Sequence, residues 1–233
     1  MRRIAISVCC LVVLAGATSS EAAVSRHRGR PVAECSLPAH AHVLTADSQA
    51  VVYTVRERVR TKAETSTVIE TRACLDGRTH SVKIGRESVS PPMEGGGRIK
   101  RLVLAGTVVA YEITVPGDNR HGRQGRPSAW HVFVRQLKTG RLIHHAPTGS
   151  ANPPNPHFVG DGEAVAIVVE EDGAVAWITD THRSKDRYQV HALDSTGERV
   201  LAVGSAIGPQ SLGLAGSMLY WTQAGKPESA TLN

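Results

Sequence analysis

Arginine side chains at short spacing carry the clearest chemistry in this sequence. They form two groups, which are Arg56, Arg58 and Arg60, and Arg120, Arg123 and Arg126. Alternate residues of an extended strand lie on one face, so the first group would present its three charges together. Clustered cations attract polyanions. The two groups are therefore candidates for a cationic rim that binds teichoic-acid-like envelope polymers, acidic glycans or anionic lipid headgroups, while a solvated basic surface that binds nothing is the stronger interpretation.

Histidines and carboxylates offer two further kinds of site. The chain has eleven His, and the pairs that stand out are His40 with His42, His144 with His145, and Asp180 with His182. No cluster of Cys or carboxylates adjoins any of these pairs, so the sequence predicts no metal site and no cofactor. Acidic residues gather at 161–163 and 170–172, in turn-like segments. A glycosidase or lyase would use two such carboxylates, and this is the enzymatic alternative.

The familiar catalytic motifs are missing from the chain. There is no Gly-x-Ser-x-Gly elbow, no phosphate-binding loop and no His-Glu-x-x-His. The sequence therefore supplies no catalytic residue, and we expect a protein that is not an enzyme.

The N-terminus reads as an export signal. Met1-Arg2-Arg3 precedes an apolar run over 4–17 and then small residues, which is the layout of a signal peptide over residues 1–22. The run is shorter than the roughly 20 residues that span a bilayer, which makes an uncleaved anchor the weaker reading, and no later segment is long and apolar enough to cross one. A basic tail over 23–34 follows. We expect a secreted or envelope-associated protein, without nucleic acid as a partner.

Cys35 and Cys74 are the cysteines that remain after such a cleavage. Exported proteins meet oxidising conditions, so an isolated pair is most simply a disulfide. Two free thiols that bind metal or do redox work are the alternative, although no C-x-x-C spacing is present.

The elements that must position these residues are short hairpins. Four segments repeat an apolar strand, a tight turn and a second strand that ends in an aromatic residue, namely Tyr53, Tyr111, Trp177 or Trp221. A second hairpin follows the first three aromatics, with turns at 75–78, 137–141 and 193–199. Each unit is thus four antiparallel strands, with repeats near 38–86, 98–147, 157–204 and 205–233 in one domain over 35–233. Such units are typical of β-propeller blades, and the fold alternative is a β-sandwich.

Insertions and ends complete the predicted domain. The segments 56–70, 115–129 and 180–186 read as exposed insertions between the second and third strands. The fourth unit offers three strands, so we expect the segment 32–37 to supply the missing strand and close a ring. An open last sheet and strand exchange between two molecules are the alternatives.

The chain resembles the exported WD40-like or TolB-like β-propeller proteins of high-GC Gram-positive bacteria. The resemblance rests on residues 35–38 after the signal, on the Asp-Gly-x-Val-x-Trp strand at 172–177 and on residues 216–221, and it spans 35–233. It implies a fold and assigns no catalytic residue. Together with the charge pattern, it favours a binding or scaffold protein of the cell envelope or extracellular space, whose partner is an anionic polymer or another protein.

Overall fold

The structure is a computed structural model that describes residues 35–60, 65–78, 80–90, 99–115, 129–149, 162–182 and 185–233. These residues form β-strands, turns and connecting segments. No helix occurs among them, and so none of them forms an apolar helix of membrane-spanning length. The predicted signal peptide and basic tail lie outside the described residues.

The strands form four antiparallel sheets, each built from consecutive strands. The first sheet contains β1 (His42–Ala46), β2 (Ala50–Arg60), β3 (Thr65–Leu75) and β4 (Ser81–Ser90). The second contains β5 (Ile99–Ala105), β6 (Val108–Val115), β7 (Ala129–Gln136) and β8 (Leu142–Pro147). The third contains β9 (Glu163–Val169), β10 (Val175–Asp180), β11 (Tyr188–Asp194) and β12 (Gly197–Gly204). The fourth contains β13 (Gly213–Ala215), β14 (Met218–Gln223) and β15 (Lys226–Thr231).

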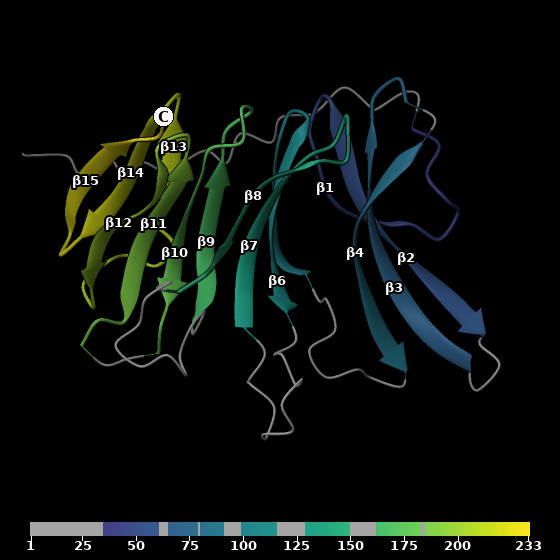
Figure 1. Ribbon diagram of the computed structural model, residues 1–233, viewed down its shortest axis with the longest axis horizontal. Helices are drawn as coiled ribbons and strands as arrows, with labels where there is room; N and C mark the ends of the chain where they lie inside the picture. Colours follow the sequence, from purple (N-terminus) through teal and green to yellow (C-terminus); the bar gives the residue numbers. More distant parts are fainter. Residues whose placement is uncertain are drawn as a thin grey trace, which may run out of the picture.

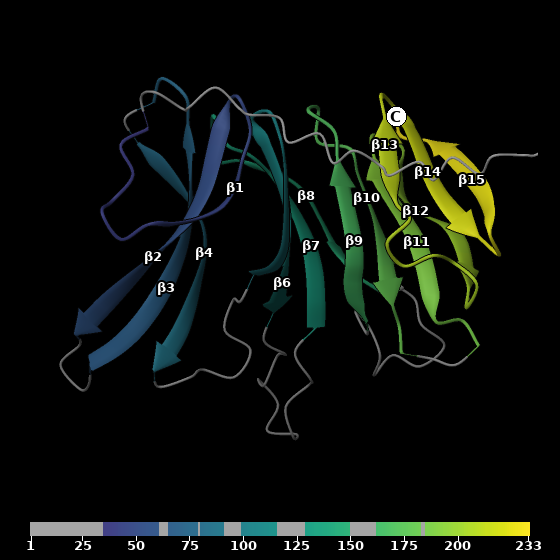
Figure 2. The ribbon, with the colours of Figure 1, turned by 180° about the vertical axis from the view of Figure 1, so that it is seen from behind.

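The sheets lie one after another along the long axis of the molecule (Figures 1 and 2). Their first strands contact each other in succession, β1 with β5, β5 with β9 and β9 with β13. A hydrogen bond links the turns of neighbouring sheets as well, since Gly106 N–H donates to Asp47 Oδ2 over 2.9 Å. Gly106 has a φ of 55°, a conformation that an L side chain rarely adopts.

Apolar side chains fill the space between successive sheets because each strand alternates its faces. Val52 and Ala73 of the first sheet pack against Val109 of the second. Two equivalent clusters join the second sheet to the third and the third to the fourth. The core is therefore a series of layers between sheets.

The four repeated aromatics occupy equivalent positions in these layers. Tyr111, Trp177 and Trp221 each pack between their own sheet and the preceding one. Tyr53 has no preceding sheet, and Cys35 and Leu37 pack in that cluster instead.

The two ends of the array differ from the prediction of ring closure. Cys35 and Leu37 lie against Tyr53 and Val51 on the outer face of the first sheet, where the predicted disulfide joins Cys35 to Cys74 with a Cα–Cα distance of 6.1 Å. The fourth sheet has three strands among the described residues. The prediction that this segment completes the fourth sheet is wrong for Cys35–Leu37, because these residues cover apolar side chains of the first sheet.

The predicted all-β class is confirmed, with four antiparallel sheets of three or four strands. The sheets do not close into a ring (Figure 1). The first predicted insertion is wrong in part, since β2 runs on to Arg60 and β3 begins at Thr65. Val55 and Val59 alternate with the arginines there, and this period of two continues the strand.

Candidate functional site

The first arginine group lies in strand β2 and is exposed. Arg56, Arg58 and Arg60 follow one face of the strand, as their alternate spacing predicts, and all three are exposed. Their cross-strand partners on β3 are Ile69, Thr67 and Thr65. The second group, Arg120, Arg123 and Arg126, lies outside the described residues. The structure therefore brings one trio of cations together.

The other face of the first sheet carries a cluster of charges around one carboxylate. Glu70 is buried and lies 2.7 Å from Arg72 Nη2, 2.7 Å from Lys83 Nζ and 3.9 Å from Arg86 Nε. The hydrogen bond from Lys83 lowers the pKa of Glu70, with Arg72 acting in the same direction. One anion is thus shared by three cations, and this surface has excess positive charge.

A pocket lies where the turns of the first and second sheets meet. Its volume is about 260 Å³. The residues that line it are Ala73, Leu75, Gly77, Arg78, His80, Ser81, Val82, Leu137 and Lys138. They come from the end of β3, the turn before β4, the start of β4 and the turn after β7, so that the pocket exists only when two sheets pack together.

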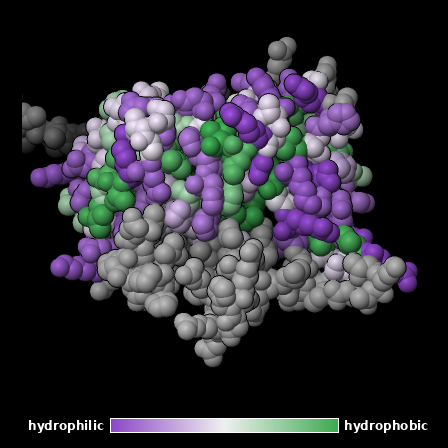
Figure 3. Space-filling model, viewed as in Figure 1, coloured by the Kyte–Doolittle hydropathy of each residue, from purple (hydrophilic) through white to green (hydrophobic). Residues whose placement is uncertain are grey.

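The chemistry of this pocket is that of an anion site with an apolar floor. Leu75 and Leu137 are buried in the core layer, whereas Arg78, His80 and Lys138 are exposed. No Asp or Glu is among the lining residues. Hydrophilic residues also gather over the sheet of β1–β4 (Figure 3). A group with negative charge and a small apolar part matches this lining.

Sequence reasoning missed these pocket residues, although it recognised both turns. The pattern of Leu, then a Gly turn, then a cation occurs at 75–78 and 137–141. The repeat could have predicted that these two turns lie side by side, because equivalent turns of stacked sheets lie at the same end of the array.

The three histidine pairs have different environments. His40 stands in the turn before β1, so it does not share a strand with His42. His145 instead meets His131, with 2.8 Å between His145 Nε2 and His131 Nδ1. No group of three or more His, Cys, Asp or Glu side chains that could hold a metal is found within the described part of the chain.

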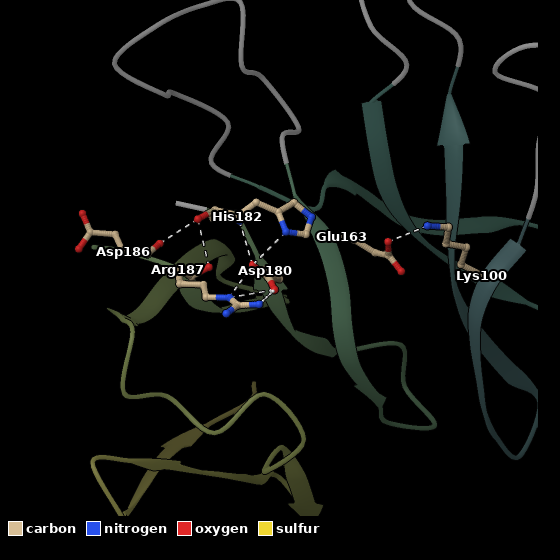
Figure 4. Close-up of polar contacts among 7 residues, drawn as sticks. Lys100, Glu163, Asp180, His182, Asp186 and Arg187 are labelled. Atoms are coloured by element: carbon tan, nitrogen blue, oxygen red, sulfur yellow. Dashed lines mark hydrogen bonds and ion pairs between the residues drawn. The ribbon is translucent and has the colours of Figure 1, made fainter. Parts of the chain in front are cut away.

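The Asp180 carboxylate accepts hydrogen bonds from residues of its own hairpin. Arg187 Nη2 donates to Asp180 Oδ2 over 3.0 Å, and the His182 N–H donates to Asp180 Oδ1 over 2.9 Å (Figure 4). Despite partial burial, these hydrogen bonds lower the pKa of Asp180. The same figure shows Lys100 of β5 facing Glu163 of β9, 2.6 Å apart, an ion pair that joins the second and third sheets.

Glu112 is the carboxyl group with the most unusual environment. It is fully buried between the second and third sheets, and its Oε1 accepts the Ala164 N–H over 2.7 Å. Its Oε2 has no hydrogen-bond partner. Burial raises the pKa of Glu112 to about 7. A raised pKa suits a general acid, but no substrate reaches a side chain without exposed surface.

Comparison with known proteins identifies no relative of this chain. No family model matches the chain, and neither a curated protein nor a solved structure matches it.

Proposed function

We propose that this chain is an exported, non-catalytic binding protein of the cell envelope or extracellular space, and that it binds an anionic polymer. The pocket at the junction of the first two sheets takes one charged unit of that polymer. The observation that carries the proposal is the lining itself, in which Arg78, His80 and Lys138 surround an apolar floor without a carboxylate.

A polymer has reason to bind here, because further cations occur on the first sheet. Arg56, Arg58 and Arg60 line one face of β2, and Arg72, Lys83 and Arg86 surround a single carboxylate on the other. These cations lie on opposite faces of the sheet and do not form one continuous array with the pocket, so their contribution is a general attraction of polyanions to the first sheet.

We also propose that the fold is propeller-like and that the protein is exported. Succession of first-strand contacts along the array supports a blade-like arrangement, and the resemblance to WD40-like or TolB-like proteins extends it. A disulfide between Cys35 and Cys74 supports an oxidising compartment.

The alternative, a hydrolase or lyase that acts on an envelope polymer, has weaker support. Of the described carboxyl groups, Glu112 has the pKa best suited to acid catalysis, yet it is buried and already accepts a backbone hydrogen bond.

The proposal is tested by thermal melting of the purified chain with inorganic pyrophosphate, with poly(glycerol phosphate) and with neutral dextran. A ligand present at 100 times its dissociation constant stabilises a protein by about 2.7 kcal/mol, which a melt detects. We expect a shift with poly(glycerol phosphate) that falls as salt rises, a smaller shift with pyrophosphate, and none with dextran.

The double variant Arg78→Ala, Lys138→Ala separates the pocket from the general charge of the protein. Arg141→Ala is the matched control, because Arg141 is an exposed cation in the same β7–β8 hairpin but does not line the pocket. The double variant should lose most of the shift, and the control should retain it. Equal losses in both, or no shift with either anion in the parent protein, would contradict the proposal.

A further inference from the structure

Two histidines on neighbouring strands direct ring nitrogens at each other. His131 lies on β7 and His145 on β8, and their facing atoms, Nδ1 and Nε2, are 2.8 Å apart. The ring centroids are 4.7 Å apart and the planes differ by 15°. The two imidazoles are therefore stacked with an offset that brings one nitrogen of each ring within hydrogen-bond distance of the other.

The pair is held by neighbouring aromatic rings. Phe133 is the cross-strand partner of His145, and their ring centroids are 4.4 Å apart. Tyr111, which is buried, stacks on the far side of this group with its centroid 5.6 Å from that of Phe133. A ring fixed in this way loses little freedom when it binds a ligand, and preorganisation of this kind favours binding.

The surroundings of both imidazoles favour their neutral forms. Burial lowers the pKa of His131 to about 4, and the neighbouring His145 contributes in the same direction. Partial desolvation of the ring also lowers the pKa of His145, although the residue as a whole is exposed. A neutral imidazole has a free electron pair on one nitrogen, which is the form that binds metals.

We propose that His131 Nδ1 and His145 Nε2 chelate a divalent transition metal, with Cu²⁺ the preferred ion. Two nitrogens that each lie about 2.0 Å from a metal, at a right angle, are about 2.8 Å apart, whereas tetrahedral ligands are about 3.3 Å apart. In the metal-free protein the 2.8 Å is the length of the hydrogen bond between the two rings, and it already brings the two nitrogens to about the separation of neighbouring ligands at a tetragonal Cu²⁺ site. Cu²⁺ also binds imidazoles more tightly than the other divalent ions of its row.

Water molecules would fill the remaining coordination positions. Within the described part of the chain, no third metal-binding side chain joins the pair. Two protein ligands leave the ion accessible, and His145 is itself exposed. The site is therefore one that acquires and releases copper readily.

Binding requires a change of tautomer but no loss of a proton. Without metal, one of the two nitrogens carries the hydrogen that bonds the other. On binding, that hydrogen moves to the far nitrogen of its own ring, and both facing nitrogens donate electron pairs to the ion. Calorimetric titration at pH 7.5 should then give the same enthalpy in buffers of different ionisation enthalpy.

The test is titration of the purified chain with Cu²⁺ alone, followed by calorimetry and by electron paramagnetic resonance. His145→Ala and His131→Gln should each weaken the tightest site at least tenfold and remove its nitrogen hyperfine pattern. His144→Ala is the matched control, because His144 adjoins His145 in β8 but points to the opposite face. The control should bind within twofold of the parent.

Other histidines of the chain also bind Cu²⁺ weakly. Comparing His145→Ala with His144→Ala separates the proposed site from this background, because each variant loses one histidine. Circular dichroism confirms that each variant is folded, and His131→Gln keeps a polar side chain of similar length. Equal affinity in the parent, His145→Ala and His131→Gln would overturn the proposal, as would an equal loss in His144→Ala.

Discussion

Glu112 shows how one buried side chain couples this fold to pH. It lies on the same face of β6 as Val108 and Ala110 and points into the layer between the second and third sheets. Its partner there is the backbone of Ala164, whose carbonyl also accepts a hydrogen bond from Arg101 Nε. The protonation state of Glu112 therefore affects how the second sheet packs on the third.

The raised pKa of Glu112 predicts that stability falls as pH rises. An unfolded Glu ionises near pH 4.5, whereas the folded protein holds this proton to about pH 7. Between these values the folded state binds more protons than the unfolded state, so stability is full below pH 4.5 and is lost towards pH 7. The loss is about 3 kcal/mol, at 1.36 kcal/mol for each pH unit of difference.

Glu112→Gln should remove most of this dependence, since the amide oxygen still accepts the Ala164 N–H and carries no charge. Urea unfolding at pH 5 and pH 8 measures the effect. We expect the variant to match the parent at pH 5 and to exceed it at pH 8. If the free energies of unfolding of the two proteins changed with pH in parallel, Glu112 would not be the cause of the loss of stability.

At the scale of elements, the repeated hairpin accounts for most of the packing. Trp177 has no exposed surface, stacks on His191 with ring centroids 5.0 Å apart, and donates through Nε1 to the Thr148 carbonyl over 2.8 Å. It thereby connects the third sheet to the segment that follows β8. Trp221 is the equivalent residue between the third and fourth sheets.

Trp177→Ala should cost about 3 to 5 kcal/mol of unfolding free energy, because it removes a large buried side chain and leaves a cavity. Tyr220→Ala is the control, since Tyr220 is an aromatic residue within β14, the strand equivalent to β10, but is 43% exposed. The control should change stability by about 0.5 kcal/mol or less. Denaturant titration measures both, and similar values for the two variants would mean that Trp177 does not stabilise the core.

The whole molecule is an open series of sheets whose two ends are covered differently. At one end, Cys35 and Leu37 cover Tyr53. At the other, Leu219 and Trp221 face inward, so Tyr220 and its cross-strand partner Ser229 lie on the exposed face. The outer face of a terminal sheet contacts solvent, and terminal repeats of other stacked folds also carry polar residues on that face.

The Cys35–Cys74 disulfide should stabilise the first end. A loop with a sequence separation of 39 residues corresponds to about 4 kcal/mol in the chain-entropy model. The double variant Cys35→Ser, Cys74→Ser should lose stability of this order in denaturant titration, and reductant should destabilise only the parent. If reductant left the parent unchanged, the disulfide would contribute nothing to stability.

The sequence by itself determined the all-β class, the hairpins and the disulfide pair. These depend on local features, which are the alternation of apolar residues, Gly at tight turns and the count of cysteines. Even Arg56, Arg58 and Arg60 share one strand face as their spacing predicts, although the sequence suggested a loop there.

Tertiary structure alone decided the arrangement of the sheets and the candidate sites. The pocket joins Arg78 to Lys138, and the imidazole pair joins His131 to His145, through packing and strand pairing. Sequence favoured His144 with His145, but neighbours in a strand point to opposite faces, so the partner of His145 comes from the adjacent strand. The position of residues 35–37 was likewise decided by packing, since Cys35 and Leu37 lie in the apolar cluster of Tyr53 on the first sheet.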